Sequence, residues 1–304
     1  MKGKDFLSVA DLEAEEVSAM VQAAQKMKSG DSPRPLEGKV LALLFEKPSL
    51  RTRVSFEVGI RQLGGECVYL SKEDIGLGTR EPESDIAGVL DRWVDGIVAR
   101  VFSHRSLQIL AERASIPVVN ALSDLEHPCQ AMGDLLTIHE QKGRLDGIKV
   151  AFVGDGNNIA ASLGLGCASV GANFTIATPK DYQVRTVAWE EAGKRAARSE
   201  SRLEWVEDPR DAVRDADVVY TDVWVSMGDE SEREERLRAF AGYQVDEELF
   251  ARAKGDAVFM HDMPAHRGEE VSEGMLEHPR SVVFDQAENR LHAQKAILAA
   301  LFAE

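Results

Sequence analysis

The amino-acid sequence predicts an α/β protein with two domains, each a doubly wound parallel sheet with helices on both faces. Short apolar runs that suit buried parallel strands alternate with segments of helical periodicity. The runs lie at residues 39–45, 66–70, 96–102, 117–122, 149–156, 173–179, 216–223 and 257–264. The alternation restarts after Gly143, and a length of 304 residues suits two hydrophobic cores better than one.

Helical periodicity sets the expected domain limits. Leu291, Ile297, Leu298 and Leu301 follow a helical repeat near the end of the chain, which predicts a closing helix. We expect one domain over residues 1–140, completed by this helix at about 285–304 packing back on it, and a second over 141–284. Other helices are expected at 54–63, 85–93, 106–114 and about 128–141.

Composition excludes several classes of protein. The 52 acidic and 36 basic residues give a net charge of -16, which argues against a nucleic-acid-binding surface. The sequence contains no apolar run of about 18 residues and no secretory signal, so we expect a cytoplasmic protein. The three cysteines are too widely spaced for a disulfide framework or a structural zinc site.

The residues that follow the predicted strands are candidate ligand contacts, because parallel sheets bind ligands at the carboxyl ends of their strands. After the first run, Ser49, Arg51, Thr52 and Arg53 lie within five residues, just before a helical segment. Hydroxyls and guanidinium groups at a helix N-terminus suit a phosphate group. The alternative, about equally weighted on spacing alone, is that Ser49 caps the helix and the arginines are solvated.

Two further strand ends carry basic or polar residues. Arg100 lies inside an apolar strand, where a guanidinium needs either a ligand or a structural ion pair. Pro128 suits the first turn of a helix, which leaves His127 at the helix mouth with Gln130 facing the same space. A single histidine is more often structural than catalytic, but this position at a strand-to-helix crossing favours a role at a site.

The second half of the chain does not carry a dinucleotide fingerprint. Gly154 and Gly156 follow a strand, but a third glycine in phase and an acidic residue after the next strand are both missing. The adjacent Asn157 and Asn158 could bind a carboxylate or simply cap the helix. Asp222, at a later strand end, is well placed to hold an ammonium group, whereas residues 229–238 are expected to be a solvated helix face.

Four segments in order along the chain resemble the aspartate/ornithine carbamoyltransferase family, and most closely its ornithine branch. The segment "FEKPSLRTR" is similar to the carbamoyl phosphate loop of the family, with Leu50 in place of the first threonine. The other three are "HPCQ" at 127–130, "DVWVSMG" at 222–228 and "FDQAENRL" at 284–291. The resemblance covers nearly the whole chain.

The resemblance implies a two-domain homotrimer whose active site lies between the domains and near a subunit interface. It implies transfer of a carbamoyl group from carbamoyl phosphate to an amine, without metal, nucleotide or other cofactor. The residues implied to contact carbamoyl phosphate are Ser49, Leu50, Arg51, Thr52, Arg100, His127, Gln130, Met263 and Arg290. Those implied to contact the amino acid are Asn158, Asp222, Ser226, Met227 and Asp262. Thr52, Arg100, His127, Asp222 and Asp262 are the expected catalytic residues.

One position departs from the ornithine pattern. The family carries His-Cys-Leu-Pro where this sequence has His261, Asp262, Met263 and Pro264. A carboxylate here could hold the substrate amine protonated, share a proton with Asp222 and act as a general base, or indicate a different amine such as lysine or putrescine. Ornithine remains the leading substrate, a non-catalytic carbamoyl phosphate-binding paralogue is the remaining alternative, and His261 is expected to be structural.

Overall fold

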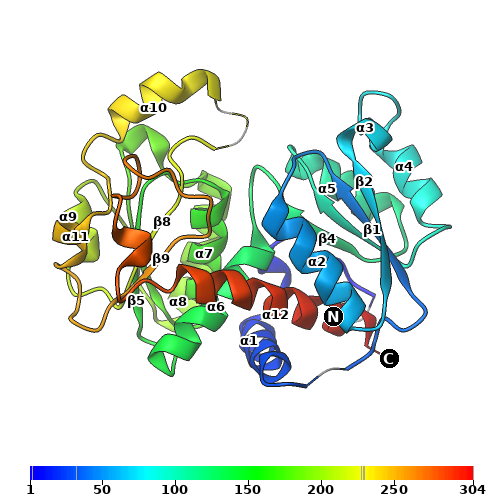
Figure 1. The fold of residues 1–304 in the computed structure, drawn as a ribbon, viewed down its shortest axis with the longest axis horizontal. Helices are drawn as coiled ribbons and strands as arrows, with labels where there is room; N and C mark the ends of the chain where they lie inside the picture. The colour runs from blue at the N-terminus through cyan, green and yellow to red at the C-terminus, as the bar shows by residue number, and fades with distance from the viewer. Residues whose placement is uncertain (2, 32, 227, 229, 304) are drawn as a thin grey trace. The chain divides into compact units, whose positions relative to one another are not determined.

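The computed structural model describes residues 1, 3–31, 33–226, 228 and 230–303. The chain divides into two compact units, Met1–Leu136 with Asn289–Glu304, and Thr137–Glu288 (Figure 1). Within the described residues, the first unit holds a four-stranded sheet and the second a five-stranded sheet. All strand pairs within these sheets are parallel, which confirms the predicted α/β class.

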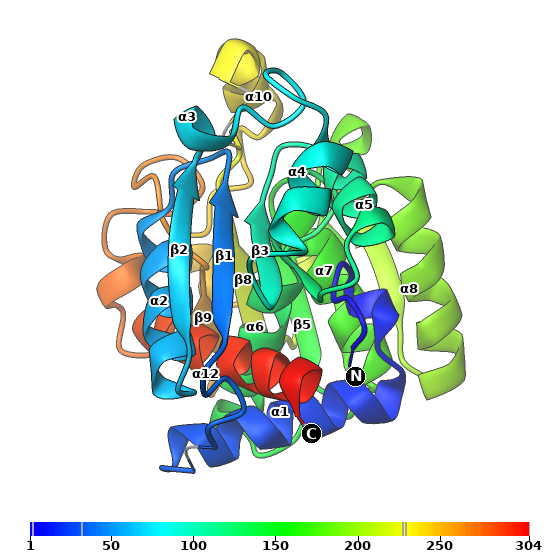
Figure 2. The ribbon, with the colours of Figure 1, turned by 90° about the vertical axis from the view of Figure 1, so that its right-hand side faces the viewer.

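The first unit is built on the strand order β2-β1-β3-β4. Its strands are β1 (Val40–Phe45), β2 (Glu66–Ser71), β3 (Gly96–Arg100) and β4 (Val118–Leu122). Its helices include α1 (Ala14–Lys28), α2 (Leu50–Gln62), α3 (Lys72–Ile75), α4 (Glu83–Leu90) and α5 (His104–Arg113). In Figure 2, α2 lies on one side of this sheet while α4 and α5 lie on the other. Ile86 and Leu107 from α4 and α5 are buried with Leu44 and Ala99 of the sheet in one core.

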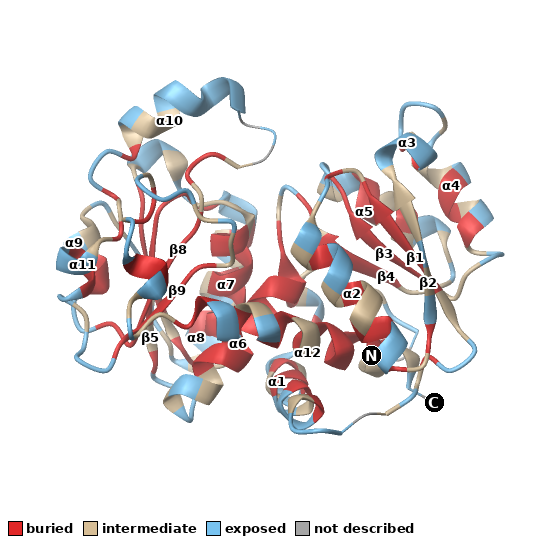
Figure 3. Ribbon diagram, viewed as in Figure 1, coloured by how far each residue is buried: buried red, intermediate tan, exposed pale blue. Residues whose placement is uncertain are grey.

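The second unit has the strand order β7-β6-β5-β8-β9. Its strands are β5 (Lys149–Val153), β6 (Asn173–Ala177), β7 (Leu203–Val206), β8 (Val218–Thr221) and β9 (Val258–Met260). Its helices include α7 (Asn158–Ser169), α8 (Thr186–Ser199), α9 (Pro209–Val213), α10 (Arg233–Ala239) and α11 (Glu247–Phe250). Every residue of α7 from Ile159 to Ser169 is buried, and Figure 3 shows the strands beside it as equally buried core.

Helix α6 (Pro128–Lys142) and helix α12 (Val283–Phe302) each supply residues to both units. The part of α12 from Asn289 onward belongs to the first unit, as the closing-helix prediction required. Lys28 Nζ of α1 donates to Asn289 Oδ1 at 2.7 Å. The apolar positions Ile297, Leu298 and Leu301 are all buried there.

Both sheets have a topological switch point, where the strand order reverses and a crevice opens at the strand ends. In the first unit the chain moves outward from β1 to β2 and from β3 to β4, so the switch point lies between β1 and β3. In the second unit it lies between β5 and β8. Ligand contacts are therefore expected directly after these four strands.

The sequence patterns did not predict several elements, β7 and α1 among them, and overextended others. The edge strand β7 has no fully buried position, so it lacks the apolar run of a central strand. Helix α1 begins in an acidic segment, and its apolar stripe of Val17, Met20 and Val21 is not among the helices that periodicity predicts. Helix α4 ends at Leu90, not at residue 93.

The predicted strand 149–156 ends early, at Val153, because the following backbone turns. Gly154 has a φ of 141°, a conformation that L side chains rarely adopt. A Cβ on Gly156 would lie 2.3 Å from Val184 N, so only glycine fits there. This turn sets the direction in which the chain enters α7.

The helices of the described residues include none that is both long and apolar enough to cross a membrane. Cys67, Cys129 and Cys167 are free thiols, as their spacing predicts. Burial raises the pKa of the Cys129 thiol to about 12, so this cysteine is a core residue and not a nucleophile.

Candidate active site

The loop after β1 forms the N-terminus of α2. Ser49 is the N-cap, and its Oγ accepts a hydrogen bond of 3.2 Å from the backbone N–H of Thr52. The Ser49 hydroxyl itself donates to Thr52 Oγ1 at 2.9 Å. Arg51 is half-buried in the first turn, and Leu50 is 75% exposed. The capping interpretation is therefore confirmed, and a helix N-terminus lies at the switch point of the first sheet, where an anion would be stabilised.

Thr52 is the meeting point of donors from three elements. Thr52 is fully buried, and its Oγ1 accepts a hydrogen bond of 3.4 Å from Nη1 of Arg100, which lies at the end of β3. Arg290 Nη2 of α12 also donates to this oxygen. With Ser49 there are three donors on one hydroxyl oxygen, which has only two lone pairs. The cluster thus has more donor capacity than this oxygen can use, an arrangement that suits an oxyanion or a phosphate.

His127 joins the same cluster as a neutral imidazole. Its Nε2 lies 3.1 Å from Arg290 Nη2, and because a guanidinium can only donate, Nε2 is the acceptor and carries no proton. Burial first, and then the positive charges of Arg290 and Arg100, hold the pKa of His127 well below its usual value. The residue is therefore a neutral polar group at pH 7, and its ring hydrogen resides on Nδ1.

Gln130 presents an acceptor in the first turn of α6. Its Nε2 donates to Asp134 Oδ1 at 2.8 Å, and this carboxylate fixes the orientation of the amide. Within the described part of the chain, the buried Gln130 Oε1 has no hydrogen-bond partner. A buried amide oxygen without a partner costs roughly 1–3 kcal/mol, so it is suited to receive an N–H from a ligand.

A close helix approach brings Arg290 to this cluster. A Cβ added at Gly133 of α6 would lie 3.1 Å from Arg290 Cα and 3.2 Å from Arg290 N. Glycine at position 133 therefore allows the backbone of α12 to come close enough for the Arg290 side chain to reach Thr52 and His127.

At the switch point of the second sheet, Asn157 and Asp222 are hydrogen-bonded. Asn157 is the N-cap of α7, and its Oδ1 accepts from the backbone N–H groups of Ile159 and Ala160. Its Nδ2 donates to Asp222 Oδ2 at 2.7 Å, directly after β8. Asn158, which the resemblance singles out, is the first residue of α7. The contact of Asn157 was missed because the cap and the candidate ligand residue are adjacent asparagines.

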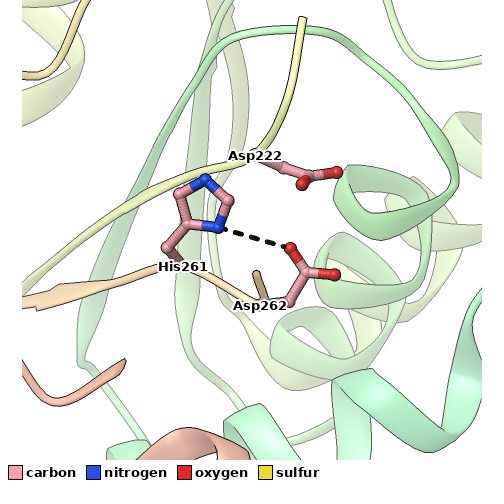
Figure 4. Close-up of side chains that lie close together, drawn as sticks. All are labelled: Asp222, His261 and Asp262. Atoms are coloured by element: carbon pink, nitrogen blue, oxygen red, sulfur yellow. Dashed lines mark ion pairs between the residues drawn. The ribbon is translucent and has the colours of Figure 1, made fainter. Parts of the chain in front are cut away.

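Asp222, His261 and Asp262 form a compact polar group (Figure 4). One ligand-type atom of each lies within 4.8 Å of the others, and both carboxyl groups lie on the same side of the imidazole. Asp222 is 6% exposed, and its carboxyl group lies close to that of Asp262. Burial, and then the charge of Asp262, raise the pKa of Asp222 well above its usual value.

His261 supports this corner and is fully buried. Its backbone N–H donates to Gln286 Oε1 at 2.9 Å, and its Nδ1 accepts from the backbone N–H of Met263 at 2.9 Å. The proton of the ring therefore lies on Nε2, which is 3.2 Å from Glu270 Oε1. Both nitrogens are occupied, so His261 serves as a structural support, as expected.

Three further residues were predicted to contact the substrates: Met263, Ser226 and Met227. Met263 adopts a φ of 56°, which is uncommon for a residue with a side chain and typical of functional corners. Ser226 is half-buried after β8. Met227 lies outside the described residues.

These features define a class: a two-domain α/β protein with a cluster of hydrogen-bond donors at the switch point of one unit and two close carboxyl groups at that of the other. The family model for the aspartate/ornithine carbamoyltransferase carbamoyl-P binding domain matches residues 4–140. The model for the Asp/Orn binding domain of the same family matches residues 146–301. The chain therefore belongs to the aspartate/ornithine carbamoyltransferase family.

Individual relatives match over nearly the full length. The ornithine carbamoyltransferase of Thermococcus kodakarensis is 52% identical over 305 residues, which cover 98% of this chain and 96% of that protein. That of Hyperthermus butylicus is 53% identical over 307 residues, or 99% of this chain and 98% of that protein. The solved structure of ornithine carbamoyltransferase from Pyrococcus furiosus superimposes with a TM-score of 0.95 at 49% identity, covering 99% of this chain and 97% of that one.

Proposed function

We propose that this protein transfers the carbamoyl group of carbamoyl phosphate to the side-chain amine of ornithine, which gives citrulline and phosphate. The observation that carries the proposal is the convergence of Ser49, Arg100 and Arg290 on Thr52 at the switch point of the first sheet. Relatives that are about half identical over the whole chain are named ornithine carbamoyltransferases, which supports ornithine as the acceptor.

In this proposal the first unit binds and activates carbamoyl phosphate. Ser49, Leu50, Arg51 and Thr52 hold the phosphate at the N-terminus of α2, where the helix dipole favours negative charge. Thr52, Arg100 and His127 stabilise the carbonyl oxygen as it becomes negative during attack, and such stabilisation usually accelerates acyl transfer more than any other single effect. Gln130 Oε1, which has no hydrogen-bond partner among the described residues, receives the carbamoyl NH₂, and Arg290 lies at the same end of the ligand.

The second unit holds the amino acid in this proposal. Asn158 binds its carboxylate, while Asp222, Ser226, Met227 and Asp262 contact the remainder, and Met263 presents its backbone to the carbamoyl group. The amine attacks the carbamoyl carbon, the bond to the phosphate oxygen breaks, and phosphate leaves. Asp262 and Met263 stand where the ornithine pattern has Cys and Leu, so substrate preference is most sensitive to change here.

We further propose a cytoplasmic homotrimer with one domain over residues 1–140 and 285–304 and another over 141–284. Several exposed apolar side chains of the first unit support association with other copies. Leu50 is 75% exposed, and Val54 and Val68 are each 48% exposed. A light-scattering mass of three chains supports the trimer, whereas the mass of one or two chains refutes it.

The central test supplies carbamoyl phosphate with ornithine, lysine or putrescine and measures released phosphate and the carbamoylated product. Citrulline formation with a kcat/KM at least tenfold above that for the other amines is expected. A higher kcat/KM for lysine or putrescine would show that ornithine is not the substrate. If calorimetry detects binding of carbamoyl phosphate but no amine is carbamoylated, the protein is a non-catalytic paralogue.

A further inference from the structure

Asp134 and Gln130 of α6 are hydrogen-bonded inside the first unit. Gln130 is 1% exposed, and Asp134 is fully buried. The Gln130 amide nitrogen Nε2 donates to Asp134 Oδ1 at 2.8 Å, and the two residues lie about one helical turn apart on the same face of α6. Gln130 Oε1 is also buried and has no hydrogen-bond partner among the described residues. One end of the amide is therefore held, and the other end is left for a ligand.

The chemistry of Asp134 decides which end of the amide is left. An amide group carries a donor and an acceptor of nearly the same size, so a half-turn about its last side-chain bond exchanges them with little change in shape. An ionised carboxylate can only accept hydrogen bonds. The Gln130 nitrogen must therefore face Asp134, and the acceptor Oε1 is presented to the ligand. A group that can also donate at position 134 would allow the opposite orientation.

This orientation distinguishes two phosphate esters of similar shape. In the proposed function, Gln130 Oε1 receives the NH₂ group of carbamoyl phosphate. Acetyl phosphate has a methyl group in place of this NH₂ and cannot donate. A site that is built to hydrogen-bond an N–H rejects an analogue without it, because a buried polar group is then left unpaired. In the opposite orientation, the Gln130 nitrogen would face the NH₂ group donor to donor, and carbamoyl phosphate would lose this advantage.

We propose that Asp134 is a positioning residue that makes the site select carbamoyl phosphate over acetyl phosphate, because it holds Gln130 Oε1 toward the NH₂ group. Asp134 acts through Gln130 and not on the ligand directly. The inference rests on the proposed function and deepens it, since it names the residue that sets the preference between the two phosphate donors. An Asp134 that only supported α6 would affect the binding of both ligands alike.

Binding of two stable analogues tests the inference without turnover. Phosphonoacetamide and acetonylphosphonate both carry CH₂ in place of the bridging oxygen of the natural ligands, and they differ only in NH₂ against CH₃. Calorimetry on the unmodified protein should give a Kd for phosphonoacetamide about 10-fold to 100-fold lower than that for acetonylphosphonate. Equal affinities would overturn the inference, and this measurement requires no variant.

Asp134→Asn keeps the size of the side chain but can present either a donor or an acceptor to Gln130. The ratio of the two Kd values should fall to about threefold or less, mainly because phosphonoacetamide binds less tightly. An unchanged ratio in this variant would show that Asp134 is only structural.

Asp95→Asn is the matched control. Asp95 Oδ2 also accepts a backbone N–H in the first unit, from Val40 at 2.8 Å, but at the opposite end of β1 from Ser49. This variant should keep the full ratio of Kd values even if its stability falls. A loss of the ratio equal to that in Asp134→Asn would mean that general destabilisation explains the effect, and the inference would be wrong.

Exchange of the two groups provides a rescue. In the double variant Gln130→Glu/Asp134→Asn, the new amide can donate to the new carboxylate, whose other oxygen can only accept. The ratio of Kd values should return to about 10-fold or more. Any effect of the moved charge on the phosphonate group is common to both analogues and cancels in the ratio. If Asp134→Asn does not fold, the double variant decides alone, and a ratio of about threefold or less in it contradicts the inference.

The inference and the proposed function can fail separately. If the unmodified protein prefers phosphonoacetamide as expected but carbamoylates no amine, the proposed function is wrong and the inference holds. If ornithine is carbamoylated while the two analogues bind equally well, only the inference is wrong. If neither analogue binds, the carbamoyl phosphate site itself is misassigned and both are wrong.

Discussion

Arg290 Nη2 lies 3.1 Å from His127 Nε2, although 163 positions separate the two residues in sequence. The same guanidinium group donates to Thr52, so α12 supplies the side chain that links the loop after β1 to the mouth of α6. A charge-assisted hydrogen bond is roughly twice as strong as a neutral one. Arg290 should therefore contribute to ligand binding more than its place near the C-terminus suggests.

Replacement of Arg290 by glutamine should lower kcat/KM for carbamoyl phosphate by about 100-fold or more, because the proposed carbamoyl phosphate site loses one fixed donor. Initial rates of phosphate release over a range of carbamoyl phosphate concentrations would measure the change. Arg61→Gln, on an α2 side chain that is 66% exposed, is the control and should retain normal kinetics. Equal effects of the two variants would contradict the assigned role.

His127 should make the protein less stable in mild acid. Its folded-state pKa lies well below its usual value, so below pH about 6.5 the unfolded chain binds a proton that the folded chain does not. Stability is then lost as pH falls, by up to about 1.4 kcal/mol per pH unit from this group. Urea unfolding between pH 5 and 7 would measure the slope.

In His127→Gln the part of this slope due to His127 should vanish. His266→Gln, at a side chain that is 43% exposed, should keep the slope of the unmodified protein. A slope that is unchanged in His127→Gln would show that position 127 is protonated in the folded state, contrary to its contact with Arg290.

Gly133 should be sensitive to one added methyl group. A Cβ at this position meets the backbone of Arg290 at 3.1 Å, and forced overpacking costs roughly 1–3 kcal/mol. Gly133→Ala should therefore lower stability and raise KM for carbamoyl phosphate together, as measured by urea unfolding and by phosphate release.

The matched control is Gly193→Ala, inside α8, where an added Cβ meets nothing within 4 Å. Alanine is the better helix former, so this variant should gain about 0.5–1 kcal/mol with unchanged kinetics. Loss of stability in Gly193→Ala, or a normal KM in Gly133→Ala, would contradict the packing argument.

The apolar runs predicted the central strands well because those strands are buried on both faces. β1 and β5 lie within runs recognised in the sequence, whereas the edge strand β7 is partly exposed and has no such run. Propensity and periodicity report burial, so they are weakest where one side of a strand faces solvent.

The sequence predicted many residues of the candidate site one by one, but it did not predict which of them contact each other. Local spacing marked Ser49 and Thr52, yet the contact of Thr52 with Arg290 joins positions 238 residues apart, which no local pattern encodes. Similarly, the two adjacent asparagines gave no sign that Asn157 would contact Asp222. Tertiary packing at the two switch points decides these pairings.

Asp222→Asn should make the protein more stable and inactive. Burial and Asp262 raise the folded-state pKa of Asp222, so between its unfolded and folded pKa values the folded chain binds more protons, and stability is lost as pH rises through that window. At pH 7 an amide removes this cost, and urea unfolding should show a higher free energy of unfolding than for the unmodified protein. Citrulline formation should fall below detection because the amine loses its ionised partner.

Asp217→Asn is the contrasting variant, since Asp217 is also buried, at 5% exposure, but accepts from Lys254 Nζ at 2.8 Å and from Lys149 N at 2.9 Å. This substitution weakens a paired carboxylate and should destabilise the protein, with kinetics retained in the folded fraction. If both substitutions destabilise alike, Asp222 is held by compensating contacts and its proximity to Asp262 costs the fold nothing. Opposite signs would show that the second unit sacrifices stability to keep two carboxyl groups together, which is the expected trade-off at a functional site.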